Sequence, residues 1–134
     1  MRPDPASLRA LPLFAALSDS ELKDLAAHLE VREASPGEHL TRQGGSGYFF
    51  FVIEAGTAAV ERDGEVVAHL GPGDFFGEGA ILGSVRRNAT VTAMSPMHLV
   101  AMFGADFAKL NADAPAVAAT VQAEMQRRRE LPSA

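Results

Sequence analysis

The spacing of apolar residues predicts a helix near the start of the chain. From Leu22 to Leu29 the apolar positions recur at i, i+3, i+4 and i+7, the spacing of a helix with one buried face. Ser18 and Glu21 stand where a capping box would begin this helix. The pattern therefore predicts a helix over about 19–29.

A shorter helical turn is expected before this helix. Leu8, Leu11 and Phe14 supply its apolar residues. Pro12 is expected to stop it, because proline lacks the N–H group that a helix interior needs. Together the two segments form a helical lead-in over 7–30.

In the middle of the chain the pattern changes to short strands separated by turns. The expected strands are 31–34, 38–42, 48–53, 57–62, 65–70, 89–93 and 97–103, and 75–76 is also strand-like. Asp63-Gly64 is a two-residue hairpin signal, because both residues tolerate the positive φ values of such a turn. Seven or eight short strands at close spacing indicate a sandwich, jelly roll or small barrel.

The C-terminal part returns to a helical pattern. A short helix is expected over Asp106–Leu110, followed by a longer one that ends near Arg129. Asn111 or Asp113 is expected to cap the longer helix, with Pro115 in its first turn.

The longer helix has a narrow apolar stripe formed by Val117, Val121 and Met125. The predicted fold is therefore mainly β with flanking helices (α+β): an antiparallel β-roll or jelly roll over 31–103, with C-terminal helices over 105–130. We expect a single domain over 1–134.

The composition mainly excludes certain classes of function and of binding site. The 134 residues carry a net charge of −5, so the chain alone lacks the electrostatic footprint of a duplex nucleic-acid binder. The absence of cysteine removes disulfides, thiol nucleophiles and thiolate metal sites. No secretory signal and no apolar run of membrane-spanning length are found. We therefore expect a cytoplasmic protein without a membrane partner.

The segment FFGEGAILGSVRRNAT, residues 75–90, has the residue types of an anion site. Gly77 and Gly79 allow close backbone approach, and a short helical turn after Gly77 would offer unpaired N–H groups to an anion. Arg87 can hold two phosphate oxygens, while Glu78, when ionised, only accepts and therefore favours hydroxyl donors. An anionic, hydroxylated small molecule such as a nucleotide fits this set.

Two motifs resemble the cyclic nucleotide-binding domain of catabolite activator proteins, protein kinase regulatory subunits and cyclic-nucleotide-gated channels. The first is GGSGYFFFVIEAG over 44–56. The second is the phosphate-binding cassette, FGEGAILGSVRRNATV over 76–91, in which FGExA precedes Arg-x-Ala-Thr at the family's spacing. The resemblance extends over roughly 12–125 and implies a short phosphate-binding helix and a C-terminal lid helix.

The resemblance also implies roles for individual residues. Glu78 would accept from the ribose 2′-hydroxyl, and Arg87 would pair with the cyclic phosphate. Thr90, or the position next to Arg87, would face the base edge, and Val121, Met125 or a nearby arginine would cover the purine. The predicted ligand-binding residues are those of the cassette: Gly77, Glu78, Gly79, Ala80, Arg87, Asn88, Ala89 and Thr90.

Three positions depart from the family's pattern. Gly79 stands where a large aliphatic residue is common, and Arg86 replaces a frequent proline. Asn88 follows Arg87 where Ala, Ser or Thr is usual, and Thr there is associated with cGMP preference. The lid also has no tryptophan or tyrosine, so base stacking would come from aliphatic groups or a guanidinium.

A metal site and an enzyme are the weaker interpretations. The histidines His28, His39, His69 and His98 are isolated from one another, whereas a cupin-type metal site needs a close His-x-His pair. No acidic pair has an evident buried partner for general acid–base catalysis. We expect no metal, no cofactor and no enzymatic activity.

The sequence thus predicts a non-enzymatic sensor that binds a cyclic nucleotide, cAMP rather than cGMP, and transmits occupancy by moving its C-terminal helix. Its partner would be an effector protein, a second copy of the chain forming a homodimer through that helix, or a further segment. Two alternatives remain open: an interaction module of the same fold that does not bind cyclic nucleotide, and the sensor part of a truncated transcription regulator.

Overall fold

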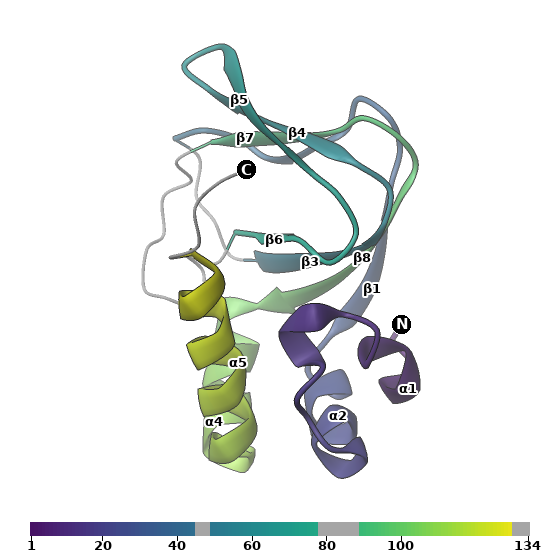
Figure 1. Cartoon of the computed structure of the whole chain (residues 1–134), viewed down its shortest axis with the longest axis vertical. Helices are drawn as coiled ribbons and strands as arrows, with labels where there is room; N and C mark the ends of the chain where they lie inside the picture. Colours follow the sequence, from purple (N-terminus) through teal and green to yellow (C-terminus); the bar gives the residue numbers. More distant parts are fainter. Residues whose placement is uncertain (45–48, 78–88, 130–134) are drawn as a thin grey trace.

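The computed structural model describes residues 1–44, 49–77 and 89–129, and it consists of a β-roll with helices packed against one side (Figure 1). The strands are β1 (Glu30–Ala34), β2 (His39–Thr41), β3 (Phe49–Ala55), β4 (Ala58–Arg62), β5 (Glu65–Leu70), β6 (Phe75–Phe76), β7 (Thr90–Ala93) and β8 (Met97–Phe103). The helices are α1 (Pro5–Leu8), the 3₁₀ turn η1 (Pro12–Phe14), α2 (Asp19–Ala26), α4 (Gly104–Asp113) and α5 (Pro115–Arg129).

The strands form two four-stranded sheets that face each other. The first has the order β1-β8-β3-β6 and the second the order β2-β7-β4-β5, and the neighbouring strands pair antiparallel. A buried cluster between the sheets takes Phe51, Ile53 and Leu99 from the first sheet and Ala58 and Val91 from the second. The predicted mainly β fold with flanking helices is confirmed.

The helices cover the outer face of the first sheet. Phe50 and Val52 of β3 and Met102 of β8 point away from the roll interior into a second buried cluster, which the helices complete. Because side chains alternate along a strand, β3 needs apolar residues on both faces. This requirement explains the unbroken apolar run in the sequence, which alternation alone would not predict.

The β4–β5 hairpin has the predicted turn. Asp63 has φ 55° and Gly64 has φ 82°, and the two strands pair in antiparallel register on either side. These positive φ values are those of the two-residue turns that suit the twist of paired strands.

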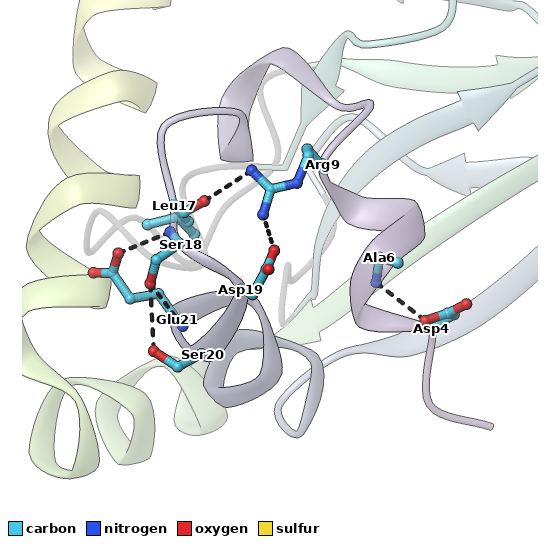
Figure 2. A network of polar contacts seen from close by, with 8 residues as sticks. All are labelled: Asp4, Ala6, Arg9, Leu17, Ser18, Asp19, Ser20 and Glu21. Carbon is cyan, nitrogen blue, oxygen red and sulfur yellow. Dashed lines mark hydrogen bonds and ion pairs between the residues drawn. The ribbon is translucent and has the colours of Figure 1, made fainter.

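The predicted capping box is also present at the start of α2 (Figure 2). The Ser18 hydroxyl accepts from the Glu21 N–H at 3.3 Å, and the Glu21 carboxylate accepts from the Ser18 N–H at 2.9 Å. Arg9 lies beside this cap, where it forms an ion pair with Asp19 and donates to the Leu17 carbonyl at 3.4 Å. The contacts of Arg9 join the residue that follows α1 to the start of α2.

Three predicted helix boundaries were wrong. Pro12 begins the turn η1 rather than ending a helix, because the first position of a helical turn needs no N–H partner. Helix α2 ends at Ala26, and Leu29 is buried by the turn that leads into β1. Asn111 and Asp113 lie inside α4, which is longer than predicted, and α5 begins at Pro115 directly after Ala114.

Candidate functional site

The two flanks of the predicted cassette lie in different sheets. Gly77 follows β6 at the edge of the first sheet, whereas Ala89 precedes β7 in the second. Glu78, Gly79, Ala80, Arg87 and Asn88 lie outside the residues that the structure describes, so their roles stay predictions. The described flanks show that the segment connects the sheets of the roll.

The N-terminal flank is anchored by aromatic packing. Phe76 is buried and its ring stacks on Phe51 with the ring centroids 5.0 Å apart. Gly77 follows with φ 75°, a backbone conformation that L side chains rarely adopt. Glycine is therefore required where the chain leaves β6.

The C-terminal flank is anchored by hydrogen bonds from β2 and the residues after it. The Thr41 hydroxyl donates to the Ala89 carbonyl at 3.0 Å and accepts from the Val91 N–H at 3.1 Å. The Thr90 hydroxyl accepts from the Gln43 N–H at 2.9 Å. The described residues of this flank are therefore held by contacts with a strand distant in sequence.

The inner wall of the roll offers apolar contacts that the sequence did not single out. The side chains that pack on the inner cluster yet stay partly exposed are Leu40, Phe49, Val60 and Leu70. They come from both sheets and can contact a flat apolar ring placed between them. Strand alternation could have found Phe49, Val60 and Leu70, which share a face with the buried inner residues, but not Leu40, which lies at the register shift of β2.

An aromatic and cationic group lies at one end of this wall. The Arg32 guanidinium lies 4.6 Å from the centre of the Phe49 ring, and the Phe49 and Phe103 rings are 5.4 Å apart. Arg32 is also within 3.4 Å of the Glu30 carboxylate. A guanidinium over an aromatic ring was not anticipated here, because these residues are far apart in the sequence.

The lid residues implied by the resemblance lie elsewhere in this structure. Val121 and Met125 are buried in the cluster formed with the N-terminal helices, on the outer side of the first sheet. Arg127 donates two hydrogen bonds to Glu124, at 3.0 and 2.7 Å, and this contact raises the pKa of its guanidinium. In this arrangement neither apolar side chain covers the roll interior.

Thr90 also points away from the interior. Val91 and Ala93 of β7 belong to the inner cluster, so Thr90 projects from the opposite face of the strand. This geometry favours a supporting role for Thr90 over a direct contact with a base.

The residues that the structure describes hold neither a cluster of metal-ligating side chains nor a membrane-spanning helix. In these residues no three of His, Asp and Glu lie together as a set of metal ligands. The helices of the same residues include none that combines the length and apolar character needed to cross a bilayer.

Comparison with known proteins identifies the family. Residues 31–113, more than half of the chain, match the family described as cyclic nucleotide-binding domain. The chain belongs to the cyclic nucleotide-binding domain family. The match includes both sheets and the whole cassette, so the resemblance seen in the sequence is confirmed.

Relatives of this domain occur in several kinds of protein. A cAMP-dependent protein kinase regulatory subunit of Eremothecium gossypii is 36% identical over 104 residues, which cover 77% of this chain and 23% of that protein. A cyclic nucleotide-gated potassium channel of Rhizobium etli is 32% identical over 124 residues, covering 92% of this chain and 34% of the channel. The chain therefore spans about a quarter to a third of the length of these relatives.

A solved structure matches this domain almost from end to end. The N-terminal domain of a transcriptional regulator from Streptomyces coelicolor superimposes with a TM-score of 0.78 at 30% identity, and the match covers 91% of each chain. Regions similar to this chain thus occur in a kinase regulatory subunit, a channel and a transcriptional regulator.

Proposed function

We propose that this domain is a non-catalytic sensor that binds a cyclic nucleotide monophosphate within its β-roll. The observation that carries the proposal is the family match over 31–113, which contains Glu78 and Arg87 at the family's spacing. In the proposed complex Arg87 pairs with the cyclic phosphate, and Glu78 accepts from the ribose 2′-hydroxyl. Gly77, Gly79, Ala80 and Asn88 supply backbone groups to the phosphate and ribose.

The described geometry is compatible with this binding mode. Gly77 and Ala89 bring the two ends of the cassette to the two sheets that enclose the interior. The partly exposed apolar wall formed by Leu40, Val60 and Leu70 can contact the flat face of a purine. A nucleotide has both parts that this arrangement would bind: an anionic phosphate at the cassette and a flat base against the apolar wall.

We propose cAMP as the preferred ligand over cGMP. Support for this preference comes from the relatives that match this chain, which include cAMP-dependent protein kinase regulatory subunits. Asn88 stands next to the arginine where Ala, Ser or Thr is usual. Its amide both donates and accepts, so Asn88 does not itself select adenine.

We also propose that occupancy is transmitted through α5 to a second copy of the chain, an effector protein or a further segment. In the structure the apolar stripe of α5 packs on the N-terminal helices, so a movement of α5 would have to exchange these contacts. This exchange provides two alternative arrangements that a ligand could favour differently.

Calorimetric titration of the purified chain with cAMP and cGMP tests the proposal, with linear 5′-AMP as the control ligand. We expect saturable binding of cAMP, weaker binding of cGMP, and a rise in melting temperature with each ligand that binds. If neither cyclic nucleotide gives heat or a melting shift at millimolar concentration, the domain is instead a module of the same fold without this ligand.

A further inference from the structure

One buried hydroxyl group occupies an unusual place in the second sheet. Among the described residues Thr41 is the one buried polar residue, with 7% of its surface exposed. Its hydroxyl donates to the Ala89 carbonyl at 3.0 Å and accepts from the Val91 N–H at 3.1 Å. A side chain thus satisfies two main-chain groups of the neighbouring strand, which burial would otherwise leave unpaired.

The strand pairing is irregular at the same point. His39 of β2 pairs with Thr92 of β7, but Thr41 pairs with Val91, so the register shifts between these two positions. The Thr41 hydroxyl bridges the ladder where the direct main-chain pattern is interrupted. The hydroxyl both donates and accepts here, whereas valine of the same shape does neither.

Gln43, two residues after Thr41, extends the contact to the β4–β5 hairpin. The Gln43 N–H donates to the Thr90 hydroxyl at 2.9 Å. The Gln43 side-chain amide donates to the Asp63 carboxylate and accepts from the Asp63 N–H, both at 2.8 Å. Thr41 and Gln43 therefore connect residues 89–91 to the tip of a hairpin.

We propose that Thr41 and Gln43 are positioning residues for ligand binding, a pair that we call the β2 clamp. The inference rests on the proposed function. Arg87 lies outside the described residues, and Ala89 follows it by two positions in the sequence, so the clamp holds the first described residue after the arginine. If the guanidinium of Arg87 is displaced slightly, the affinity for the anion falls, because charge-assisted hydrogen bonds depend on distance and angle.

The clamp also accounts for the position of Thr90. Its hydroxyl accepts from the main chain of Gln43 on the outer side of β7, while its neighbour Val91 is fixed through Thr41. Three successive residues at the C-terminal end of the cassette, Ala89, Thr90 and Val91, are thus hydrogen-bonded to residues 41–43.

The experiment measures cAMP affinity by calorimetry for the unchanged chain and for T41V, T41S and T92V. T92V is the matched control, because Thr92 lies on the same pair of strands and its hydroxyl contacts the exposed His39 ring at 2.8 Å. We expect T41V to weaken binding by about tenfold, while T41S and T92V stay within about threefold of the unchanged chain. Titrations are made well below the melting temperature of each variant, with the number of sites recorded, so that unfolded protein does not imitate weak binding.

The outcomes separate the clamp from the proposed function. If the unchanged chain binds cAMP and T41V binds as tightly as T92V, the clamp is wrong and the proposed function stands. Loss of affinity in T41V without recovery in T41S also overturns it, because serine retains the hydroxyl. If the unchanged chain binds neither cAMP nor cGMP, the proposed function is wrong and the clamp with it.

A second variant keeps the test decisive if T41V does not fold. The Gln43 side chain is exposed, so Q43A is expected to fold while losing both contacts with Asp63. We expect Q43A, which removes two hydrogen bonds, to weaken cAMP binding by about five- to tenfold, with a melting temperature close to that of the unchanged chain. Affinity equal to that of the unchanged chain would overturn the part of the clamp that includes the hairpin.

Discussion

At the scale of single residues, polar side chains satisfy main-chain groups where regular elements begin or are interrupted. Asp4 accepts from the Ala6 N–H at the start of α1, and Ser18 with Glu21 caps α2 (Figure 2). Thr41 has the same role inside a sheet. Each of these contacts replaces a hydrogen bond that the backbone cannot make with itself.

The capping contact makes stability depend on pH. Hydrogen bonds from Ser18, first from its backbone, lower the pKa of Glu21 below 4.5. A lowered pKa gives stability that is complete above the unfolded-state value and is lost as the pH falls through the folded-state value. We expect urea unfolding of the unchanged chain to lose stability between pH 5 and pH 3 by a larger amount than E21Q does. Identical losses in both proteins would contradict this role.

At the scale of elements, one tight turn shows how closely the sheets are joined. Gly56 lies between β3 and β4 with φ 93°, and a Cβ there would come within 2.4 Å of the Pro96 carbonyl oxygen. Gly64 in the β4–β5 hairpin has a similar φ of 82° but no atom within 4 Å of that position. The two glycines share the backbone conformation and differ in the space beside them.

This difference predicts unequal effects of the same substitution. G56A combines a strained backbone with a clash against main-chain atoms and is expected to lower the free energy of unfolding by at least about 2 kcal/mol. G64A adds strain alone and is expected to cost about 1 kcal/mol. Chemical denaturation of the two variants measures both values, and equal losses would show that the space beside Gly56 adds nothing.

The elements also show what the sequence could and could not predict. The hairpin at Asp63-Gly64, the cap of α2 and most strands follow from local patterns, because their signals lie within a few residues. The end of α2 did not follow, because Leu29 continues the apolar spacing but is buried by a turn. Sheet order is equally invisible locally, since neighbours such as β1 and β8 come from opposite ends of the roll.

The candidate site likewise contains residues that the sequence indicated and residues that it did not. The cassette residues lie in one short segment, so their types indicated an anion site and the family resemblance implied their individual roles. Thr41 and Gln43 were missed because the residues they contact are distant along the chain: Ala89, Thr90 and Val91 are more than 40 positions away, and Asp63 is 20 positions away. The inner apolar wall was missed because alternation becomes informative only once the inward face of each strand is known.

At the scale of the whole molecule, the first sheet separates two buried clusters. One lies between the sheets, and the other lies between the first sheet and the helices (Figure 1). The second cluster joins the two ends of the chain, because it contains Val121 and Met125 of α5 together with Leu8 of α1 and Leu22 of α2. A movement of α5 would therefore change the packing of the N-terminal helices.

This arrangement predicts a structural role for the stripe of α5. Met125 is completely buried, so M125A is expected to lower the free energy of unfolding by about 2–5 kcal/mol, the usual cost of removing a buried methionine side chain. M94A is the matched control, since Met94 is 57% exposed and its loss is expected to change stability by less than about 0.5 kcal/mol. Similar values for both variants would mean that α5 is not held in this position in solution.

The central claim is that the cassette binds a cyclic phosphate through Arg87, and two adjacent arginines allow a direct measurement. Calorimetric titration with cAMP compares the unchanged chain, R87A and R86A. We expect R87A to lose a charge-assisted interaction of about 1.5–3 kcal/mol, or about 10- to 150-fold in affinity, while R86A stays close to the unchanged chain. Binding of cAMP by R87A as tight as that of the unchanged chain would place the phosphate elsewhere and contradict the account.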